Sequence, residues 1–378
     1  MSLVYDMEKS KKIEWINILR GFAIFLIVFG HAIGYSKGLT GLSRYLSSFY
    51  VPLFFFISGY LFQENKEEKL SLYIKRKARR ILIPYFVFAI LSLIPYYLFA
   101  GNISADLDTN VDTSNSIVSS LLTIFYGSGH GDLLIQNSPL WFLPCYFLVV
   151  VIAKVVYEKT GNCKLKSILL SLLFLVIGGI VYYFFNGAYP FGLETALVML
   201  YFYFLGHQLK QVSEKLNDFH HSMSSEHSNH TKLKLLIAII SLIFGFAIHL
   251  FNGRISCMNN DYKNSYIIFI LSASFSLIGY CYLFSLLKKC SLLSYLGKHT
   301  IPILVAHKMP LVVFQSKLGI ISTCLKNGNS FLQFSLALLM AICSIALSIL
   351  AYKIVSKFLP ILYGENKHKV NENKHFKQ

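Results

Sequence analysis

The sequence predicts an all-α, polytopic integral membrane protein, a bundle of about ten transmembrane helices with both termini in the cytoplasm. Of its 378 residues, 55% are hydrophobic and only 14% are charged, whereas soluble domains carry about 25% charged residues. The apolar residues come in long blocks, and most basic residues lie between those blocks. A chain with so little charge lacks the polar surface of a globular protein, so this pattern favours a lipid bilayer as the solvent.

Ten apolar blocks are candidates for transmembrane helices, because a helix needs about 20 residues to cross roughly 30 Å of hydrocarbon. They lie near residues 14–34, 46–62, 81–100, 140–157, 167–186, 190–209, 233–252, 265–287, 300–317 and 331–355. The second block is short, and only a turn around Asn186 and Pro190 separates the fifth from the sixth. The N-terminus lacks the small-residue cleavage site of a signal peptide, so we expect the first block to be retained as a helix.

The distribution of basic residues tests this number of spans. Ten spans place both termini on one side of the membrane. With the termini in the cytoplasm, 27 of the 35 Lys and Arg residues fall in cytoplasmic segments and 6 in outer segments, while Arg20 and Lys308 lie within spans. The positive-inside rule predicts this asymmetry. The net charge of +17 therefore indicates membrane orientation rather than nucleic-acid binding.

The sequence predicts a single membrane domain over residues 1–360 and a polar, basic cytoplasmic tail over residues 361–378. The seven cysteines form no CxxC pair, and we expect neither disulfides nor a metal site. The longest outer loop, residues 101–138, holds four Asp and no Lys or Arg. We interpret it as a solvated loop or as a lid that faces a sugar.

Ionisable residues inside a membrane span are costly and usually mark functional sites. Six such residues fall within the predicted spans: Arg20, His31, Glu194, His249, His307 and Lys308. Arg20 and His31 are eleven residues apart, which is about three helical turns. Both side chains therefore point to one helix face, with about 16 Å between them along the helix axis.

This spacing gives one helix face a fixed cation and, farther from the cytoplasm, a titratable base. The Arg20 guanidinium is suited to bind phosphate. The neutral imidazole of His31 is suited to take a proton from a hydroxyl near pH 7. The alternative is that Arg20 extends to the inner interface and that His31 caps the helix at the outer one. The chemistry alone leaves both interpretations open.

A resemblance favours the chemical interpretation. The segment Ile13–Ala32, IEWINILRGFAIFLIVFGHA, is similar to the opening signature of the acyltransferase-3 family of membrane acyltransferases, with Arg20, Gly21 and His31 at the matching positions. Further motifs of that family follow in order: PLFFFISGYLF at 52–62, RKARRILIPY at 76–85, LWFLPCYFL at 140–148, YFYFLGHQLK at 201–210 and YLGKHTIPILVAH at 295–307. The chain more closely resembles the fucose 4-O-acetylase-like branch. It departs from that branch at Asn17, where Asp is frequent, which leaves the supporting role of Asn17 open.

The resemblance implies a membrane-embedded acyltransferase that O-acetylates a sugar hydroxyl of a cell-surface polysaccharide or lipid-linked glycan. It implies a multi-pass protein of the bacterial inner membrane, with acetyl-CoA as acyl donor and no permanently bound cofactor. The bilayer, acyl-CoA and a glycan acceptor are the implied partners. Arg20 and His31 are then the catalytic residues: Arg20 faces the donor, and His31 deprotonates the acceptor hydroxyl or relays the acyl group.

Three motifs supply candidate binding residues. The resemblance assigns Arg76 and Arg80, from the basic cluster before the third span, to the phosphates of coenzyme A, although this cluster is also a topology signal. Ser58, beside Gly59 in the second span, would let a ligand approach closely or would simply pack against a helix. Trp141 begins the fourth span at the outer interface, where aromatic residues are enriched.

Two other intramembrane residues are candidates for a supporting role. His307 ends the last motif, and we interpret it either as a site residue or as a hydrogen-bonded packing residue. Lys308 is expected to extend to the interface or to pair with an acid such as Glu194. Pairing would give both residues a buried partner and would lower the cost of placing them in the membrane.

The main alternative function is a transporter or flippase of lipid-linked sugars. Such a protein would share the spans and the intramembrane charges, but it would not turn over acyl-CoA. Transporters are often built from internal repeats, and no repeat is evident in this sequence. A non-catalytic sensor fits less well, because it would not need a costly Arg and His on one helix face.

Overall fold

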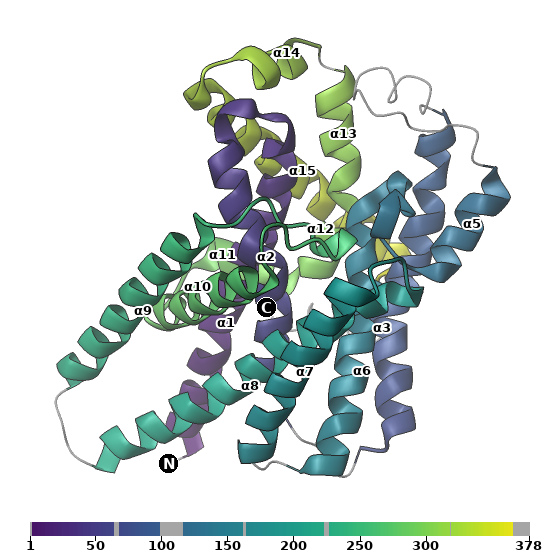
Figure 1. The fold of residues 1–378 in the computed structure, drawn as a ribbon. Helices are drawn as coiled ribbons and strands as arrows, with labels where there is room; N and C mark the ends of the chain where they lie inside the picture. The colour runs from purple at the N-terminus through teal and green to yellow at the C-terminus, as the bar shows by residue number, and fades with distance from the viewer. Residues whose placement is uncertain are drawn as a thin grey trace.

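The fold was described from a computed structural model, which covers residues 2–63, 68–98, 116–161, 164–222, 227–317 and 319–365. These residues form helices and connecting segments, with one isolated β-bridge between Ser256 and Asp261 and no strand among them. The helices pack as a bundle (Figure 1). The predicted fold class, an all-α polytopic membrane protein, is therefore confirmed.

The principal α-helices in chain order are α1 Ser2–Ala32, α2 Thr40–Leu61, α3 Leu70–Leu91, α5 Ile117–Tyr126, α6 Phe142–Thr160, α7 Lys164–Phe184, α8 Leu193–Ser222, α9 His227–His249, α10 Tyr266–Ser285, α11 Ser291–Lys298, α12 Thr300–Ala306, α13 Lys308–Lys317, α14 Gly319–Asn327 and α15 Ser330–Phe358. Short 3₁₀ segments join them, including η1 Ile33–Tyr35, η3 His130–Asp132, η4 Ile135–Trp141 and η7 Pro360–Tyr363. Each of the ten predicted blocks overlaps at least one of these helices.

Seven helical segments in the described part of the chain are long and apolar enough to cross a membrane. They are Glu14–Ala32, Leu70–Leu98, Ile135–Thr160, Leu165–Phe184, Thr231–His249, Tyr266–Ser285 and Ser330–Phe358. Helices α7, α9 and α15 expose most of their apolar side chains, as expected for helices that face lipid. The predicted number of about ten spans is not confirmed by length and composition and stays a prediction.

Helices α2 and α8 lie inside the bundle, where they face protein on most sides. A Cβ atom on Gly59 would lie 1.8 Å from the Tyr203 carbonyl oxygen, and one on Gly206 would lie 2.0 Å from the Phe56 carbonyl oxygen. The two backbones therefore touch at a crossing that only glycine permits. The crossing holds Ser58, which neighbours Gly59, at a fixed height in the bundle.

A second crossing of this kind holds α1 against α11. A Cβ atom on Gly21 would lie 1.8 Å from the Leu293 carbonyl oxygen, and one on Gly297 would lie 1.9 Å from the Asn17 carbonyl oxygen. Gly21, the glycine of the Arg-Gly pair, therefore has a structural role: its missing side chain lets α11 contact the α1 backbone directly. This contact places the start of α12 beside Arg20.

The predicted span 300–317 is an apolar helical stretch, Thr300–Gln315, which a turn at His307 divides into α12 and α13. Pro310 lacks the N–H that would donate to the Ala306 carbonyl in a straight helix. Two side chains contact the backbone at this turn: His307 Nδ1 lies 3.0 Å from the Ile303 carbonyl oxygen, and Ser344 Oγ donates to the His307 carbonyl at 2.7 Å.

The ends of the helices alternate between two sides of the bundle. In Figure 1 the N-terminus, the end of α6, the start of α7, the end of α8 and the start of α9 lie at the lower end of the view. The charge pattern predicts that these five ends share one side, while the full alternation and the side that faces the cytoplasm stay predictions. Of the predicted tail, Tyr363 is 3% exposed and packs against Phe88 of α3; residues 366–378 lie outside the described part.

Candidate active site

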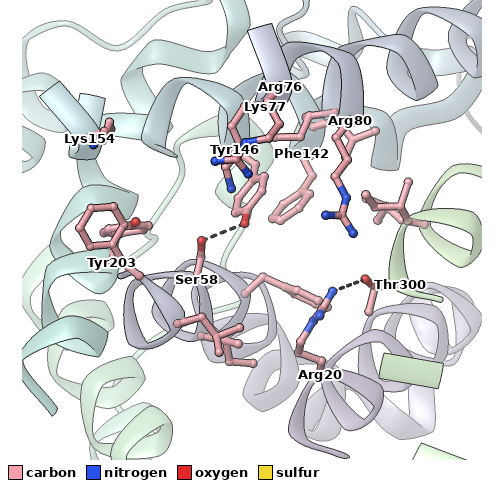
Figure 2. A pocket seen from close by; sticks show the side chains of 18 of the residues that line it. Arg20, Ser58, Arg76, Lys77, Arg80, Phe142, Tyr146, Lys154, Tyr203 and Thr300 are labelled. Atoms are coloured by element: carbon pink, nitrogen blue, oxygen red, sulfur yellow. Dashed lines mark hydrogen bonds between the residues drawn. The ribbon is translucent and has the colours of Figure 1, made fainter. Parts of the chain in front are cut away.

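A cavity of about 510 Å³ lies between α1, α2, α3, α6, α8 and α12. Five basic side chains line it: Arg20, Arg76, Lys77, Arg80 and Lys154. They come from three helices, and Figure 2 shows them on two facing walls with aromatic and aliphatic side chains between them. The structure thus brings together Arg20, Arg76 and Arg80, which the sequence analysis assigned to the donor, and places Ser58 beside them.

Arg20 and Arg80 point into the same space from opposite walls of the cavity (Figure 2). Arg20 Nη2 donates a hydrogen bond to Thr300 Oγ1 at 3.0 Å. That bond uses one of the five N–H donors of the guanidinium, so it fixes the side chain while leaving most donors available. Two such cations facing one space create a site for a doubly charged anion.

Arg76 differs from Arg20 and Arg80 because it already binds a carboxylate. Its Nε donates to Glu68 Oε1 at 2.9 Å, and its Nη2 donates to Glu68 Oε2 at 2.8 Å. Glu68 lies in the connection before α3, and the hydrogen bond from Arg76 lowers the pKa of its carboxyl. The Glu68 carboxylate therefore occupies a position at the edge of the cavity that an anionic ligand could take.

A second acid–base pair lies at the same end of the cavity. Lys154 is 2% exposed, and its Nζ lies 3.2 Å from Glu158 Oε1. The Tyr73 ring lies near Arg76, Lys77 and Lys154, with distances of 5.3 to 5.8 Å from the cationic groups to the ring centroid. These cation–π contacts hold the basic side chains together despite their like charges.

The middle of the cavity is apolar. Its walls include Ile24 and Ile27 of α1 and Leu304 of α12, together with Phe142 of α6. One polar contact crosses this section: the hydroxyl groups of Ser58 and Tyr146 are 2.8 Å apart. A ligand that fills the cavity would therefore have an anionic end near the arginines and a slender, mostly apolar remainder.

Two histidines lie one helical turn beyond the apolar end of the cavity. On α1 the lining face runs from Arg20 through Ile27, and His31 follows on that face. On α12 the lining reaches Leu304, and His307 follows three residues later. Four residues of helix span about 6 Å. His31 therefore does not line the cavity, but it lies on α1 just beyond the apolar end of the cavity.

The rings of His31 and His307 have centroids 5.4 Å apart. His307 is fully buried, and its Nδ1 lies 3.0 Å from the Ile303 carbonyl oxygen and 2.9 Å from the Leu304 carbonyl oxygen. Because carbonyl oxygens only accept, Nδ1 carries the proton and the neutral ring keeps a lone pair on Nε2. His307 Nε2 has no hydrogen-bond partner among the described residues, so it is free to accept a hydrogen bond from an N–H of His31.

The other predicted site residues do not join this cavity. Asn17 lies one turn before Arg20 and contacts Gly297 through its carbonyl. Trp141 ends η4, 7% exposed, in contact with Phe142. Glu194, in the first turn of α8, is 1% exposed, and it forms no ion pair with Lys308 in the described structure. The roles predicted for these residues stay predictions.

The sequence analysis missed several residues of the site. Tyr146, Tyr203 and Thr300 all line the cavity, and all three lie inside motifs that carried the family resemblance. Lys154 was counted only as a cytoplasmic charge. The motifs identified the helices, but they gave no indication of which side chains turn toward the cavity.

Fold and site together define a multi-pass membrane protein with an internal, cation-lined cavity that leads to a histidine pair. The acyltransferase-3 family model, described as an acyltransferase domain, matches residues 13–353, and the chain belongs to this family. The protein is therefore a membrane acyltransferase, which confirms the predicted family but not its fucose 4-O-acetylase-like branch. No curated protein and no solved structure matches the chain.

Proposed function

We propose that this acyltransferase moves an acetyl group from acetyl-CoA to a sugar hydroxyl of a cell-surface polysaccharide or lipid-linked glycan in the bacterial inner membrane. One observation carries the proposal: the cavity runs from facing arginines, Arg20 and Arg80, to within one helical turn of His31 and His307. This order of chemistry matches a donor with an anionic head, a thin arm and a reactive end.

The cationic end of the cavity suits the diphosphate of coenzyme A. Arg20 and Arg80 would hold its oxygens from two sides with charge-assisted hydrogen bonds. A volume of about 510 Å³ falls within the range of roughly 300–1,000 Å³ that is typical of small-molecule sites. Arg76 would join them once the donor displaces the Glu68 carboxylate.

The apolar section suits the arm that links the diphosphate to the thioester. Ile24, Ile27 and Leu304 would line this arm and exclude water from it. The thioester carbonyl would then lie near the turn that carries His31. Holding the acyl group in this position lowers the entropic cost of the reaction.

The proposed reaction is a direct transfer with His31 as general base. One nitrogen of His31 takes the proton of the acceptor hydroxyl, and the oxygen attacks the thioester carbonyl carbon. The C–S bond breaks, and the coenzyme A thiolate leaves and takes up a proton. His307 Nε2 accepts a hydrogen bond from the other His31 nitrogen, which orients the ring so that its free lone pair faces the hydroxyl.

The test measures acetylation directly. The full-length protein in lipid nanodiscs would be given labelled acetyl-CoA, and surface glycans from cells with wild-type protein or His31→Ala would be compared by mass spectrometry. We expect acetyl transfer that depends on His31 and on a glycan. Normal O-acetylation with His31→Ala would overturn the role of His31, and no turnover of acyl-CoA at all would favour a transporter of lipid-linked sugars instead.

A further inference from the structure

Two cations lie on the side of His31 that faces away from the donor cavity. Lys308 follows His307 directly at the bend between α12 and α13. Arg254 Nη2 lies 3.8 Å from the position that a Cβ atom on Gly34 would take, and Gly34 is one turn beyond His31 in η1. Besides His307, Lys308 and Arg254 are the groups whose charges act on the His31 ring.

These two cations have no counter-ion in the described structure. The ion pairs formed by described residues join Arg76 to Glu68, Lys154 to Glu158 and Lys263 to Asp261. None of these pairs includes Lys308 or Arg254, and neither side chain forms a hydrogen bond within the same residues. Asp132 is the acid that acts electrostatically on Lys308, but it lies outside ion-pair distance.

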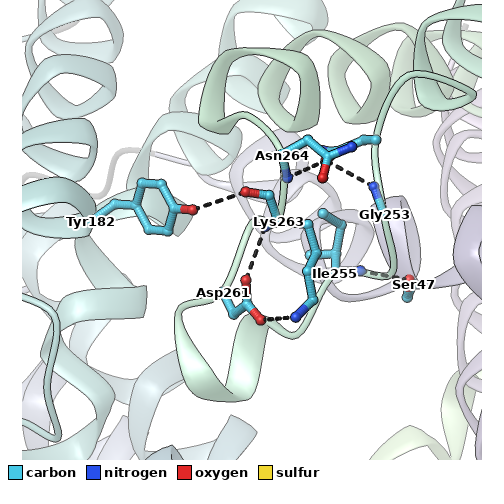
Figure 3. Close-up of polar contacts among 8 residues, drawn as sticks. Ser47, Tyr182, Gly253, Ile255, Asp261, Lys263 and Asn264 are labelled. Carbon is cyan, nitrogen blue, oxygen red and sulfur yellow. Dashed lines mark hydrogen bonds and ion pairs between the residues drawn. The ribbon is translucent and has the colours of Figure 1, made fainter.

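The position of Arg254 is determined by the backbone on both sides of it. Gly253 N donates to Asn252 Oδ1 at 2.9 Å, and Ile255 N donates to Ser47 Oγ of α2 at 3.2 Å. Figure 3 shows the two contacts flanking the segment. Hydrogen bonds that fix the neighbouring residues hold the Arg254 backbone beside η1 without using its guanidinium.

The same connection contains a second cation that is neutralised. Lys263 Nζ lies 2.5 Å from Asp261 Oδ2, while Lys263 N donates to Asp261 Oδ1 at 2.9 Å. Tyr182 OH donates to the Lys263 carbonyl at 3.3 Å (Figure 3). Within one connection, therefore, Lys263 has its own carboxylate and Arg254 does not. Because Arg254 is exposed as well as unpaired among the described residues, its guanidinium is available to an external anion.

We propose that the acceptor of this enzyme carries a negatively charged group, a carboxylate or a phosphate, which binds Arg254 and Lys308 while its hydroxyl faces His31. The inference rests on the proposed acyl transfer and specifies its acceptor. An unpaired, half-buried ammonium is costly until an anion joins it, and Arg254 adds donors with the fork geometry that carboxylates and phosphates accept. An acidic sugar unit or a sugar phosphate provides this chemistry.

The test uses full-length protein in nanodiscs of neutral lipid and three probes: methyl galactoside, methyl galacturonide and galactose 1-phosphate. Acetyl transfer from labelled acetyl-CoA gives a KM for each probe, and direct binding is measured separately without donor. We expect the KM of at least one anionic probe to be about tenfold below that of the neutral probe, as a hydrogen bond between charged groups provides. The carboxylate and phosphate probes distinguish the two sources of charge.

Variants assign the preference to the two cations. Arg254→Gln and Lys308→Gln should bring the ratio of neutral to anionic KM toward one, and Lys308→Arg should restore it. Lys263→Gln, in the same connection, should leave the ratio unchanged. Equal KM values for neutral and anionic probes with the wild type, or a ratio that survives Arg254→Gln, would overturn the inference.

The binding measurement separates this inference from the proposed function. If no probe is acetylated but anionic probes bind in a manner that requires Arg254, the anion site stands and the proposed acyl transfer to these sugars fails. If acetylation occurs without a preference for anionic probes, the proposed function stands and the anion site fails. If the wild type neither acetylates nor preferentially binds anionic probes, both fail.

Discussion

His31 and His307 lie with their ring centroids 5.4 Å apart, and His307 directs its protonated Nδ1 to two backbone carbonyls. His307 is thereby fixed in one tautomer, with the lone pair of Nε2 unused among the described residues. A histidine that is fixed in this way serves as a hydrogen-bond acceptor for its neighbour. The pair comes from α1 and from the bend after α12, which are far apart in the sequence.

The first prediction concerns this pair. His31→Ala should lower kcat by about 10²- to 10⁴-fold, the usual contribution of a general base, and His307→Ala should lower it by less. His307→Gln should recover part of the loss, because an amide oxygen can accept the same hydrogen bond. The measurement is kcat and KM for acetyl-CoA. Ser344→Ala, which removes only the hydrogen bond to the His307 carbonyl, should change kcat little; an equal loss in this control would indicate a packing role for His307.

A second prediction separates two neighbouring arginines of α3. Arg80 lines the cavity, whereas Arg79 does not. Arg80→Ala should raise KM for acetyl-CoA about tenfold, because charge-assisted hydrogen bonds to a phosphate are lost, and kcat should change less. Arg79→Ala removes the same charge from the adjacent position and should leave KM unaltered. Identical effects of the two variants would assign the cluster to membrane orientation alone.

The third prediction follows from the pair of Arg76 and Glu68. Glu68→Gln should lower the Kd of acetyl-CoA by up to about fivefold at pH 7, because the donor no longer competes with a carboxylate in a partly exposed pair. Arg76 lowers the pKa of Glu68, so the pair is intact above the ordinary Glu value of about 4.3 and is lost as the pH falls through the lowered one. Wild type and variant should therefore differ at pH 6 to 8 and converge only below about pH 4.

Glu158→Gln is the matched control for that experiment. Glu158 pairs with Lys154, but Glu158 itself does not line the cavity. Its Kd for acetyl-CoA at pH 7 should stay close to that of the wild type. A Glu68→Gln variant that binds acetyl-CoA no better than the wild type would show that the carboxylate does not occupy the donor position.

The fourth prediction tests the contact between α1 and α11. Gly21→Ala places a Cβ atom 1.8 Å from the Leu293 carbonyl oxygen, and backbone cannot move as a side chain can. Overpacking of this kind costs about 1–3 kcal/mol or more, so the melting temperature in detergent should fall by about 2 °C or more. A Cβ on Gly41 meets nothing within 4 Å, and Gly41→Ala should not lower it. Equal melting temperatures for the two variants would contradict the crossing.

Much of the fold could be predicted because membrane helices are determined by local composition. Long apolar blocks and basic ends identified a helix in every predicted span. The grouping of Arg20 with Arg76 and Arg80 was predictable for a similar reason, since the charge pattern placed all three toward the same side of the membrane. These properties depend on residues that are close in the sequence, so one sequence is enough to predict them.

The rest of the site depends on contacts between distant segments. Nothing local indicates that Thr300 would meet Arg20, because that contact requires the glycine crossing of α1 and α11. The turn at His307 involves Pro310 and Ser344. The effect of Pro310 on a helix can be predicted from the sequence, whereas the contact of Ser344 with the His307 carbonyl cannot, because it joins distant segments. The suggestion that Lys308 pairs with Glu194 considered charge alone, whereas the structure places Lys308 beside His307 and within the field of Asp132.

The apolar turn between the cavity and the histidines has a consequence for the membrane as a permeability barrier. An enzyme that takes one substrate from each face of the membrane must let the acyl group reach the acceptor without opening a path for ions. Ile27 and Leu304 are 5% and 6% exposed, and they separate the arginine-lined cavity from the pair of histidines. A thioester arm can pass between such side chains, whereas hydrated ions cannot do so cheaply. Under the proposed function, the turn that guides the donor would also keep ions from leaking across the membrane through the enzyme.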